Sequence, residues 1–174
     1  MDSNKYLLSI LVDNEPGVLS RISGLFSGRG FNIDSLSVAA TNNPEVSRIT
    51  MVTSCEPPII EQIKKQLNKL VNIITVNDLT EKRFIQRQLS LVKVNAQPEK
   101  RAEILRIVDI FRCKIIDVGA DHYTIEVSGD MEKFDAFLNL VKPMGIIEIA
   151  STGSIALARE NGKNGKKENG KQIK

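Results

Sequence analysis

The segment Asn14-Glu15-Pro16-Gly17-Val18-Leu19-Ser20-Arg21-Ile22 decides how this chain begins to fold. It follows the alternating apolar run Tyr6–Val12, and together they predict a strand, a tight loop and an amphipathic helix. A helix start leaves backbone N–H groups without intrahelical partners and carries partial positive charge. Gly17 has no side chain, so a ligand can approach this backbone closely. The segment therefore predicts a receptor for a small anion such as a carboxylate, and a sensor rather than a catalyst.

Working outward from this loop, the apolar spacing predicts six elements in the order strand, helix, strand, strand, helix, strand. Both helices carry apolar residues at three- and four-residue spacing, which gives each of them one apolar face. This order is the split βαβ arrangement of ferredoxin-like folds. The predicted elements span Tyr6–Val12, Val18–Gly28, Asn32–Thr41, Val46–Ser54, Pro57–Leu70 and Asn72–Asp78.

The same order recurs in the second half of the chain, after a short charged linker at Thr80–Arg83. The sequence therefore predicts an α+β protein with two tandem ferredoxin-like domains, residues 1–80 and 81–159, followed by a tail at 160–174. The final element of the repeat is predicted as one strand or a pair of strands. The repeated elements span Ile85–Ala96, Pro98–Phe111, Cys113–Gly119, Tyr123–Ser128, Met131–Val141 and Ile146–Ala158.

Composition separates the tail from the rest of the chain. Hydrophobic residues make up 41% of the 174 residues, enough for packed cores. The tail holds five lysines and two glutamates, a surplus of three that equals the formal net charge of +3. We expect it to be disordered and to keep the protein soluble, with a nucleic-acid or partner contact as the alternative. Two cysteines suggest a reducing compartment. We expect no membrane span, signal peptide or transit peptide, hence a cytoplasmic protein or, if plastid-encoded, a stromal one.

The two predicted repeats differ at the loop before their first helix. The second has Ala96-Gln97-Pro98-Glu99-Lys100, which lacks a glycine for close approach, and Glu99 would repel an anion. We therefore expect a carboxylate site in the first domain alone. The second domain is then free to act as a scaffold or as a partner surface.

A free amino acid would suit such a site. Its carboxylate needs N–H donors, which the loop before Gly17 supplies. The side-chain amides of Asn14 and Asn32, with strand carbonyls, provide acceptors for its ammonium group. We expect an aliphatic pocket for its side chain, and therefore a branched-chain amino acid, with the pocket lined by Val18, Ile33, Val38 and Ala39. The alternative is that Asn14 only caps a helix and Gly17 only relieves a tight turn.

Other uses of this fold fit the residues less well. The only histidine, His122, is predicted to be an exposed turn residue, and Cys113 to be a small hydrophobe in a buried strand. The carboxylates are scattered, so we expect no catalytic or metal site. Acylphosphatases share the fold but need a positioned arginine in the loop. RNA binding needs aromatic residues on a central strand, and Arg48-Ile49-Thr50-Met51-Val52 has none; we expect no nucleic-acid partner.

The residues Asn14–Phe26, followed by Arg29-Gly30-Phe31-Asn32-Ile33-Asp34-Ser35-Leu36, resemble ACT domains. More narrowly, they resemble the regulatory (small) subunits of acetolactate synthase, also called acetohydroxyacid synthase. The resemblance runs from about Tyr6 to Arg159, and further stretches that carry it are Glu61–Val71, Ile110–Val118 and Ile147–Gly153. The chain departs from this family at Cys113, where the family has glycine, a change we expect to be neutral.

The resemblance implies a chain without a reaction centre or cofactor of its own. In this family the large subunit carries thiamine diphosphate, Mg²⁺ or a similar divalent metal, and FAD, and condenses pyruvate with pyruvate or 2-oxobutyrate. The small subunit activates it and confers feedback inhibition, usually by valine, in branched-chain amino-acid biosynthesis. A free-standing, amino-acid-sensing ACT regulator without an enzyme partner is the alternative.

The resemblance also implies where the effector binds. ACT domains of this family form homodimers by pairing side by side, and the effector lies at the interface. On that pattern Asn14, Gly17 and Val18 come from one chain, and Asn32 and Ile33 come from its partner.

Overall fold

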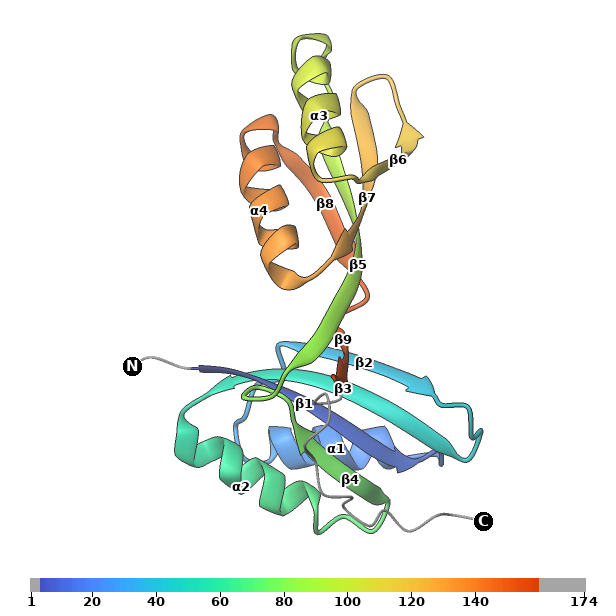
Figure 1. Cartoon of the computed structure of the whole chain (residues 1–174), viewed down its shortest axis with the longest axis vertical. Coiled ribbons are helices and arrows are strands. Elements are labelled where there is room, and N and C mark those ends of the chain that lie inside the picture. The colour runs from blue at the N-terminus through green and yellow to red at the C-terminus, as the bar shows by residue number, and fades with distance from the viewer. Residues whose placement is uncertain (1–3, 160–174) are drawn as a thin grey trace.

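A computed structural model describes residues 4–159, so the predicted disordered tail at 160–174 lies outside the described residues. The first half of the chain forms one antiparallel sheet in the order β2-β3-β1-β4, with both helices on one face (Figure 1). This is the sheet order of a ferredoxin-like fold. Its elements are β1 (Asn4–Asp13), α1 (Val18–Ser27), β2 (Ser35–Ala40), β3 (Val46–Cys55), α2 (Pro57–Leu67) and β4 (Ile73–Asp78).

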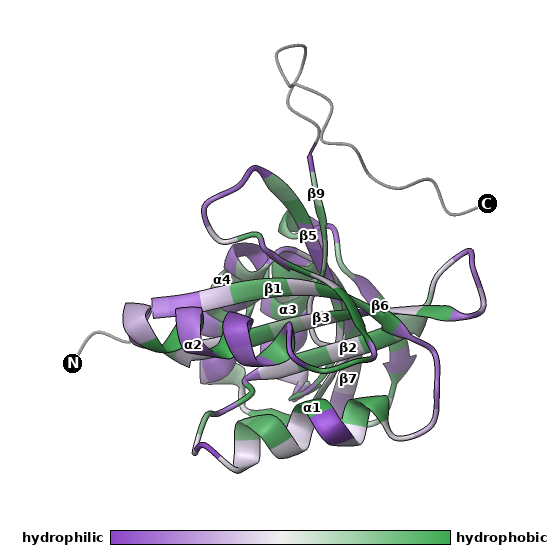
Figure 2. Ribbon diagram, turned by 90° about the horizontal axis from the view of Figure 1, so that it is seen from below, coloured by the Kyte–Doolittle hydropathy of each residue, from purple (hydrophilic) through white to green (hydrophobic). Residues whose placement is uncertain are grey.

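The core of this unit follows from the alternation of side chains along β1. Leu8, Ile10 and Val12 point to the helix side and are almost fully buried against Ile22 and Phe26 of α1. The odd-numbered side chains between them, such as Leu7 and Ser9, lie on the open face of the sheet. The apolar stretches of β1 and β3 are green in Figure 2, whereas the loops that join the strands are mostly purple.

The second half repeats this architecture, with its sheet in the order β6-β7-β5-β8 and two helices on one face. The predicted α+β class with two ferredoxin-like domains is therefore confirmed. The last predicted strand divides into two at a loop, and the second piece pairs elsewhere. The elements are β5 (Phe84–Asn95), α3 (Pro98–Ile110), β6 (Lys114–Val118), β7 (His122–Gly129), α4 (Met131–Val141), a short 3₁₀ turn (Lys142–Met144), β8 (Ile146–Ser151) and β9 (Ile155–Ala158).

Strand β5 is long enough to belong to both halves of the molecule. Its second part pairs with β7 and β8, while Phe84–Arg87 pairs with β9 to form a two-stranded ribbon. One face of this ribbon packs on the open face of the first sheet, where Ala156 is buried with Leu7 and Val52. The ribbon therefore fixes the second unit on the first (Figure 1).

The loop between β8 and β9 makes a second contact between the units. The Ser154 N–H donates to the Ser35 Oγ at 3.2 Å, and the Ser154 Oγ accepts from the Gln86 amide at 2.7 Å. Gly153 has a φ of 75°, in the left-handed region that favours glycine. A Cβ there would lie 2.7 Å from the Ser35 Oγ and 3.3 Å from the Leu36 carbonyl oxygen. The loop therefore fits against the start of β2 with no room for a side chain.

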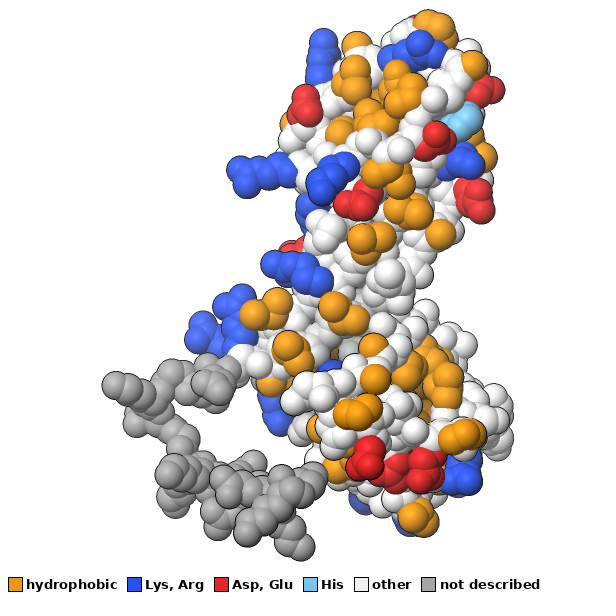
Figure 3. Space-filling view, turned by 90° about the vertical axis from the view of Figure 1, so that its right-hand side faces the viewer, with side chains coloured by type: hydrophobic (Ala, Val, Ile, Leu, Met, Phe, Trp, Pro, Cys, Tyr) orange, Lys and Arg blue, Asp and Glu red, His pale blue; other side chains and the backbone are white. Residues whose placement is uncertain are grey.

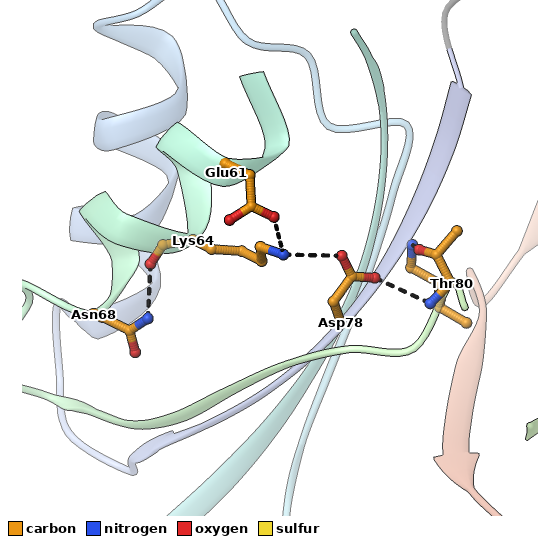
Figure 4. A network of polar contacts seen from close by, with 6 residues as sticks. Glu61, Lys64, Asn68, Asp78 and Thr80 are labelled. Carbon is orange, nitrogen blue, oxygen red and sulfur yellow. Dashed lines mark hydrogen bonds and ion pairs between the residues drawn. The ribbon is translucent and has the colours of Figure 1, made fainter. Parts of the chain in front are cut away.

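Hydrogen bonds and an ion pair fix the chain where the predicted linker begins. Asp78, at the end of β4, accepts from the Thr80 N–H at 3.0 Å and pairs with Lys64 of α2 at 3.4 Å (Figure 4). Lys64 also pairs with Glu61, and this hydrogen bond is the main reason that the pKa of Lys64 is raised. The Thr80 Oγ1 accepts from the Leu7 N–H at 3.1 Å. The chain therefore leaves the first sheet in a defined direction.

Element boundaries differ from the sequence prediction by three residues at two places, and by one or two residues elsewhere. β2 begins at Ser35 rather than Asn32, because Asn32 donates to the Asp34 carboxylate and leaves the ladder irregular there. α2 ends at Leu67 rather than Leu70. Among residues 4–159, no helix has the length and apolar character that would let it cross a membrane.

Substituting Gly153 with alanine should weaken the contact between the two units. The left-handed backbone costs an L-residue about 1 kcal/mol, and the clash with Ser35 and Leu36 should add ~1–3 kcal/mol. Gly30→Ala is the matched control, because Gly30 has a φ of 69° and open space around its Cβ position. Urea unfolding measures the free energy of unfolding of both variants. Equal losses would mean that the loop does not fit tightly against β2.

Candidate effector site

The loop between β1 and α1 presents unpaired backbone donors. Gly17 is the N-cap residue of α1, with a φ of 85°, and no side chain caps the helix. Among the described residues, the N–H groups of Gly17, Leu19 and Ser20 have no hydrogen-bond partner, and that of Val18 makes only a 3.4 Å contact with the Glu15 carbonyl. All three free donors belong to exposed residues. Three free N–H groups at a helix start favour an anion.

Gly17 serves this site in two ways. Its positive φ is a conformation that residues with a side chain rarely adopt. Apart from the neighbouring residues in the chain, no atom of the described structure lies within 4 Å of the position where a Cβ would stand, so the space above the loop is open. The backbone of the turn therefore favours glycine here, and the glycine also leaves the N–H groups accessible to a ligand.

The side chain of Asn14 ties the loop to the turn between β2 and β3. Its Nδ2 donates to the Pro44 carbonyl at 2.8 Å, and its Oδ1 accepts from the Ser47 hydroxyl at 3.0 Å. The Asn14 N–H also donates to the Glu45 carbonyl at 2.7 Å. The amide thus holds the loop at the end of the sheet where β2 finishes.

A polar network beside the loop was not predicted from the sequence. The buried Asn72 amide donates to the carboxylates of Asp13 at 3.2 Å and Glu15 at 3.1 Å, and its Oδ1 accepts from Arg21 of α1. Two carboxylates therefore lie near the free N–H groups. Such a pair suits the ammonium group of an amino acid better than an amide does, because ionised acceptors make the stronger hydrogen bonds. Asp13, Glu15 and Arg21 are each 51 or more positions away from Asn72, so no local sequence pattern connects them.

Asn32 and Ile33 lie far from the Gly17 loop within one chain. Ser35 begins β2 opposite Val52, and Val52 lies opposite Leu7 of β1, whereas Asn14 follows the other end of β1. The six residue-to-residue steps from Leu7 to Asp13 span about 20 Å. One chain therefore does not bring these two parts of the predicted site together.

The predicted aliphatic pocket is wrong for a single chain. Val38 lies opposite Ile49 and points to the helix side, whereas Ala39 lies opposite Arg48 on the open face of the sheet. Adjacent residues of a strand point to opposite faces, so these two side chains cannot line one pocket. The Val18 side chain is buried in the core, 4% exposed, and Ile33 packs against the same core. Only the backbone of Val18 faces the loop.

The corresponding loop of the second unit is arranged differently. Helix α3 begins with Pro98 and has Glu99 in its first turn. The Arg101 guanidinium donates to the carbonyl of Ala96 at 2.9 Å and also to that of Ala120. An acidic side chain thus stands at this helix start, as the sequence predicted, and an arginine ties the loop down.

His122 and Cys113 differ in detail from the sequence prediction. His122 is not an exposed turn residue, because it begins β7 with its ring between Asp117 at 3.4 Å and Asp121 at 3.1 Å. Its hydrogen bond to Asp121 lowers the pKa of that carboxyl group. Cys113 precedes β6 and packs against the second core, where burial raises the pKa of its thiol. A raised pKa disfavours the reactive thiolate. In the described part of the chain, no three His, Cys, Asp or Glu side chains gather as metal ligands would.

Replacing Asn72 with alanine should destabilise the first unit by ~1–3 kcal/mol, because it removes buried hydrogen bonds and leaves Asp13 and Glu15 facing each other without a donor. Asn68→Ala is the matched control, since Asn68 is exposed and bonds only to its own helix. The free energies of unfolding of the two variants are compared by urea unfolding. A loss no larger than that of the control would show that the network does not order the loop.

Comparisons with known proteins agree with this architecture. Two family models match the chain, an AHAS small subunit-like ACT domain at residues 8–75 and the small subunit of acetolactate synthase at residues 87–160. A probable acetolactate synthase small subunit from Archaeoglobus fulgidus is 46% identical over 159 residues, covering 91% of this chain and 99% of that protein. The acetolactate synthase small subunit of Mycolicibacterium smegmatis is 46% identical over 154 residues, covering 88% and 91%.

A solved structure gives the same result in three dimensions. The acetolactate synthase small subunit from Thermotoga maritima superimposes with a TM-score of 0.80 at 39% sequence identity, over 91% of this chain and 99% of that one. The agreement extends through both units and the ribbon that joins them. The chain therefore belongs to the family of acetolactate synthase small subunits, with an ACT domain as its first unit.

Proposed function

We propose that this chain is a regulatory subunit without catalytic activity of its own. It binds the acetolactate synthase large subunit, raises its activity, and makes it sensitive to feedback inhibition by a branched-chain amino acid, with valine the first candidate. The observation that carries the proposal is the open loop at Gly17, with three unpaired N–H groups, in a chain that belongs to the small-subunit family.

The loop offers complementary partners for both charged groups of an amino acid. The carboxylate accepts hydrogen bonds from the N–H groups of Gly17, Leu19 and Ser20. The ammonium group lies toward Asp13 and Glu15, whose positions the Asn72 amide fixes. A simple anion would gain only the first set of contacts and would be repelled by the carboxylates. The arrangement therefore favours a zwitterion over phosphate or sulfate.

A two-fold dimer would complete the site. β2 is at the edge of its sheet and has no neighbour on its outer side within residues 4–159. If two copies pair antiparallel along β2, the end of β2 in one chain lies beside the start of β2 in the other. The Gly17 loop lies at the first of these ends, and Asn32 and Ile33 precede the second. This pairing would bring the Gly17 loop of one chain beside Asn32 and Ile33 of the other. We therefore expect a homodimer with the effector at its interface.

Binding across two chains provides a route to inhibition. A ligand shifts an equilibrium only as far as it binds one state better than the other, and a tenfold change requires about 1.4 kcal/mol of coupling. In the dimer, the effector would contact residues next to Ser35, which receives the hydrogen bond from Ser154 of the second unit. A shift at the start of β2 would therefore reach the second unit directly.

Gly17→Asp should abolish inhibition by valine while leaving activation of the large subunit intact. The new carboxylate would stand where the ligand carboxylate binds, and like charges repel. The measurement is acetolactate formation by the reconstituted enzyme over a range of valine concentrations. Activation by the variant reports that it is folded and bound.

Gly24→Asp is the matched control, because Gly24 is an exposed residue of the same helix with open space at its Cβ position. It should keep the inhibition curve of the wild type. Full inhibition of the Gly17→Asp enzyme would exclude the proposed site, and equal loss in both variants would point to a general effect of charge on α1.

The identity of the effector can be tested on the isolated chain with a thermal-shift panel of the common amino acids. Valine or a close relative, at a hundred times its dissociation constant, should stabilise the protein by about 2.7 kcal/mol. Gly17→Asp should show no such shift. Equal stabilisation by an acidic or aromatic amino acid would contradict the branched-chain assignment.

The alternative is a free-standing amino-acid sensor with no enzyme partner. It predicts the same thermal shift but no association with the large subunit. Co-purification of the two subunits from one expression strain distinguishes these functions. Membership of the small-subunit family favours the large-subunit partner.

A further inference from the structure

The β5–β9 ribbon has one face packed and one face free. Gln86 and Ala156 lie opposite each other in the ribbon and point toward the first sheet. On the other face, Ile85 lies opposite Leu157, and Arg87 lies opposite Ile155. The three aliphatic side chains of this face are 45%, 60% and 56% exposed, for Ile85, Leu157 and Ile155 in turn. A short ribbon thus presents three large aliphatic side chains to solvent in the described structure.

This free face forms one wall of a groove of about 340 Å³. The floor is the open face of β2 and β3, where the side chains other than Arg48 are small, and the wall is the ribbon. Figure 3 shows hydrophobic side chains, with Lys or Arg beside them, where the two units meet. Floor and wall include Ser37, Ala39, Thr50, Ile85, Ile155 and Leu157. The groove is therefore a narrow apolar surface on which few large side chains would block a partner.

The charges of the groove have one sign. Arg48 of β3 and Arg87 of β5 line it, and no acidic residue among residues 4–159 does. Arg48 is fixed in place because its guanidinium donates to the Ser9 hydroxyl at 2.8 Å. Guanidinium groups beside an apolar surface favour a partner that carries carboxylates next to apolar side chains.

Two other occupants fit this chemistry poorly. The chain's own residues 160–174 include five lysines and a single large apolar residue, Ile173, so they match neither the apolar wall nor the arginines. A second copy that used the same surface would bring together two grooves that each carry Arg48 and Arg87 and no acidic residue among the described residues. Like charges in an interface are unfavourable.

We propose that this groove, which we call the ribbon groove, is a docking site for an apolar segment of the acetolactate synthase large subunit that bears acidic side chains. The inference rests on the proposed function, since it assumes that the chain binds that subunit. The segment lies along the β2–β3 floor, its apolar side chains contact Ile85, Ile155 and Leu157, and its carboxylates pair with Arg48 and Arg87.

The test measures the affinity of the full chain for the purified large subunit, by titration calorimetry and by the concentration needed for activation. Leu157→Asp and Arg87→Glu should each weaken binding at least tenfold, because the first puts a charge on the apolar wall and the second reverses the charge of the groove. Both side chains are exposed, so folding should be unaffected. The thermal shift produced by valine should also remain.

Matched controls carry the same changes elsewhere on the strands and helices of the second unit. Val118→Asp alters an aliphatic side chain of β6 that is 66% exposed, and Arg106→Glu alters an exposed arginine of α3. Both controls should bind the large subunit as the wild type does. Binding by Arg87→Glu should also lose the part of its salt dependence that the guanidinium contributes.

The possible outcomes separate the two proposals. If the wild type binds and Leu157→Asp and Arg87→Glu bind equally well, the ribbon groove is not the docking site, although the proposed function stands. If the wild type does not bind at all, the proposed function and the docking assignment both fail. If Leu157→Asp changes the oligomeric state of the isolated chain, measured by sedimentation, the groove holds a second copy and the large-subunit assignment is overturned.

Discussion

The architecture depends on one constraint, the continuity of β5 through both halves of the molecule. Its second part is a central strand of the second sheet, and its first part forms the ribbon with β9 that packs on the first sheet. A strand cannot bend freely without losing hydrogen bonds to its neighbouring strands. Pairing along the length of β5 therefore fixes the position of the second unit relative to the first. The buried cluster around Leu7, Val52 and Ala156 then holds the ribbon in place. The ribbon groove exists because this strand stands against the open face of the first sheet.

The two units share one fold and differ in the loop before their first helix. In the first, Gly17 in the left-handed conformation leaves three N–H groups free at the start of α1. In the second, Pro98 and Glu99 occupy the helix start, and Arg101 ties the neighbouring loops together. The sheet orders correspond strand for strand. The proposed ligand site therefore depends on loop chemistry, while the repeated scaffold supplies position and stability.

Strand β2 is where the proposed activities meet. Its outer edge is available for a second chain, its start contacts the loop of Gly153 and Ser154, and its open face forms the floor of the ribbon groove. An effector bound beside its first residues would act on an element that also touches the second unit and the proposed partner surface. This shared element would give the proposed feedback inhibition a short physical route, because no signal needs to cross the packed core.

The sequence by itself determined the order of the elements, both helix-covered cores and the Gly17 loop. These features follow from local periodicity and from the few residues that tolerate a positive φ. It did not show that Asn72 joins Asp13 and Glu15, that Val38 and Ala39 face opposite sides of β2, or that β9 returns to the first unit. Each of these depends on strand register or on contacts between residues far apart in the chain. Tertiary structure decided them because a shift of one residue in a strand exchanges its two faces, and local sequence does not encode which strands become neighbours.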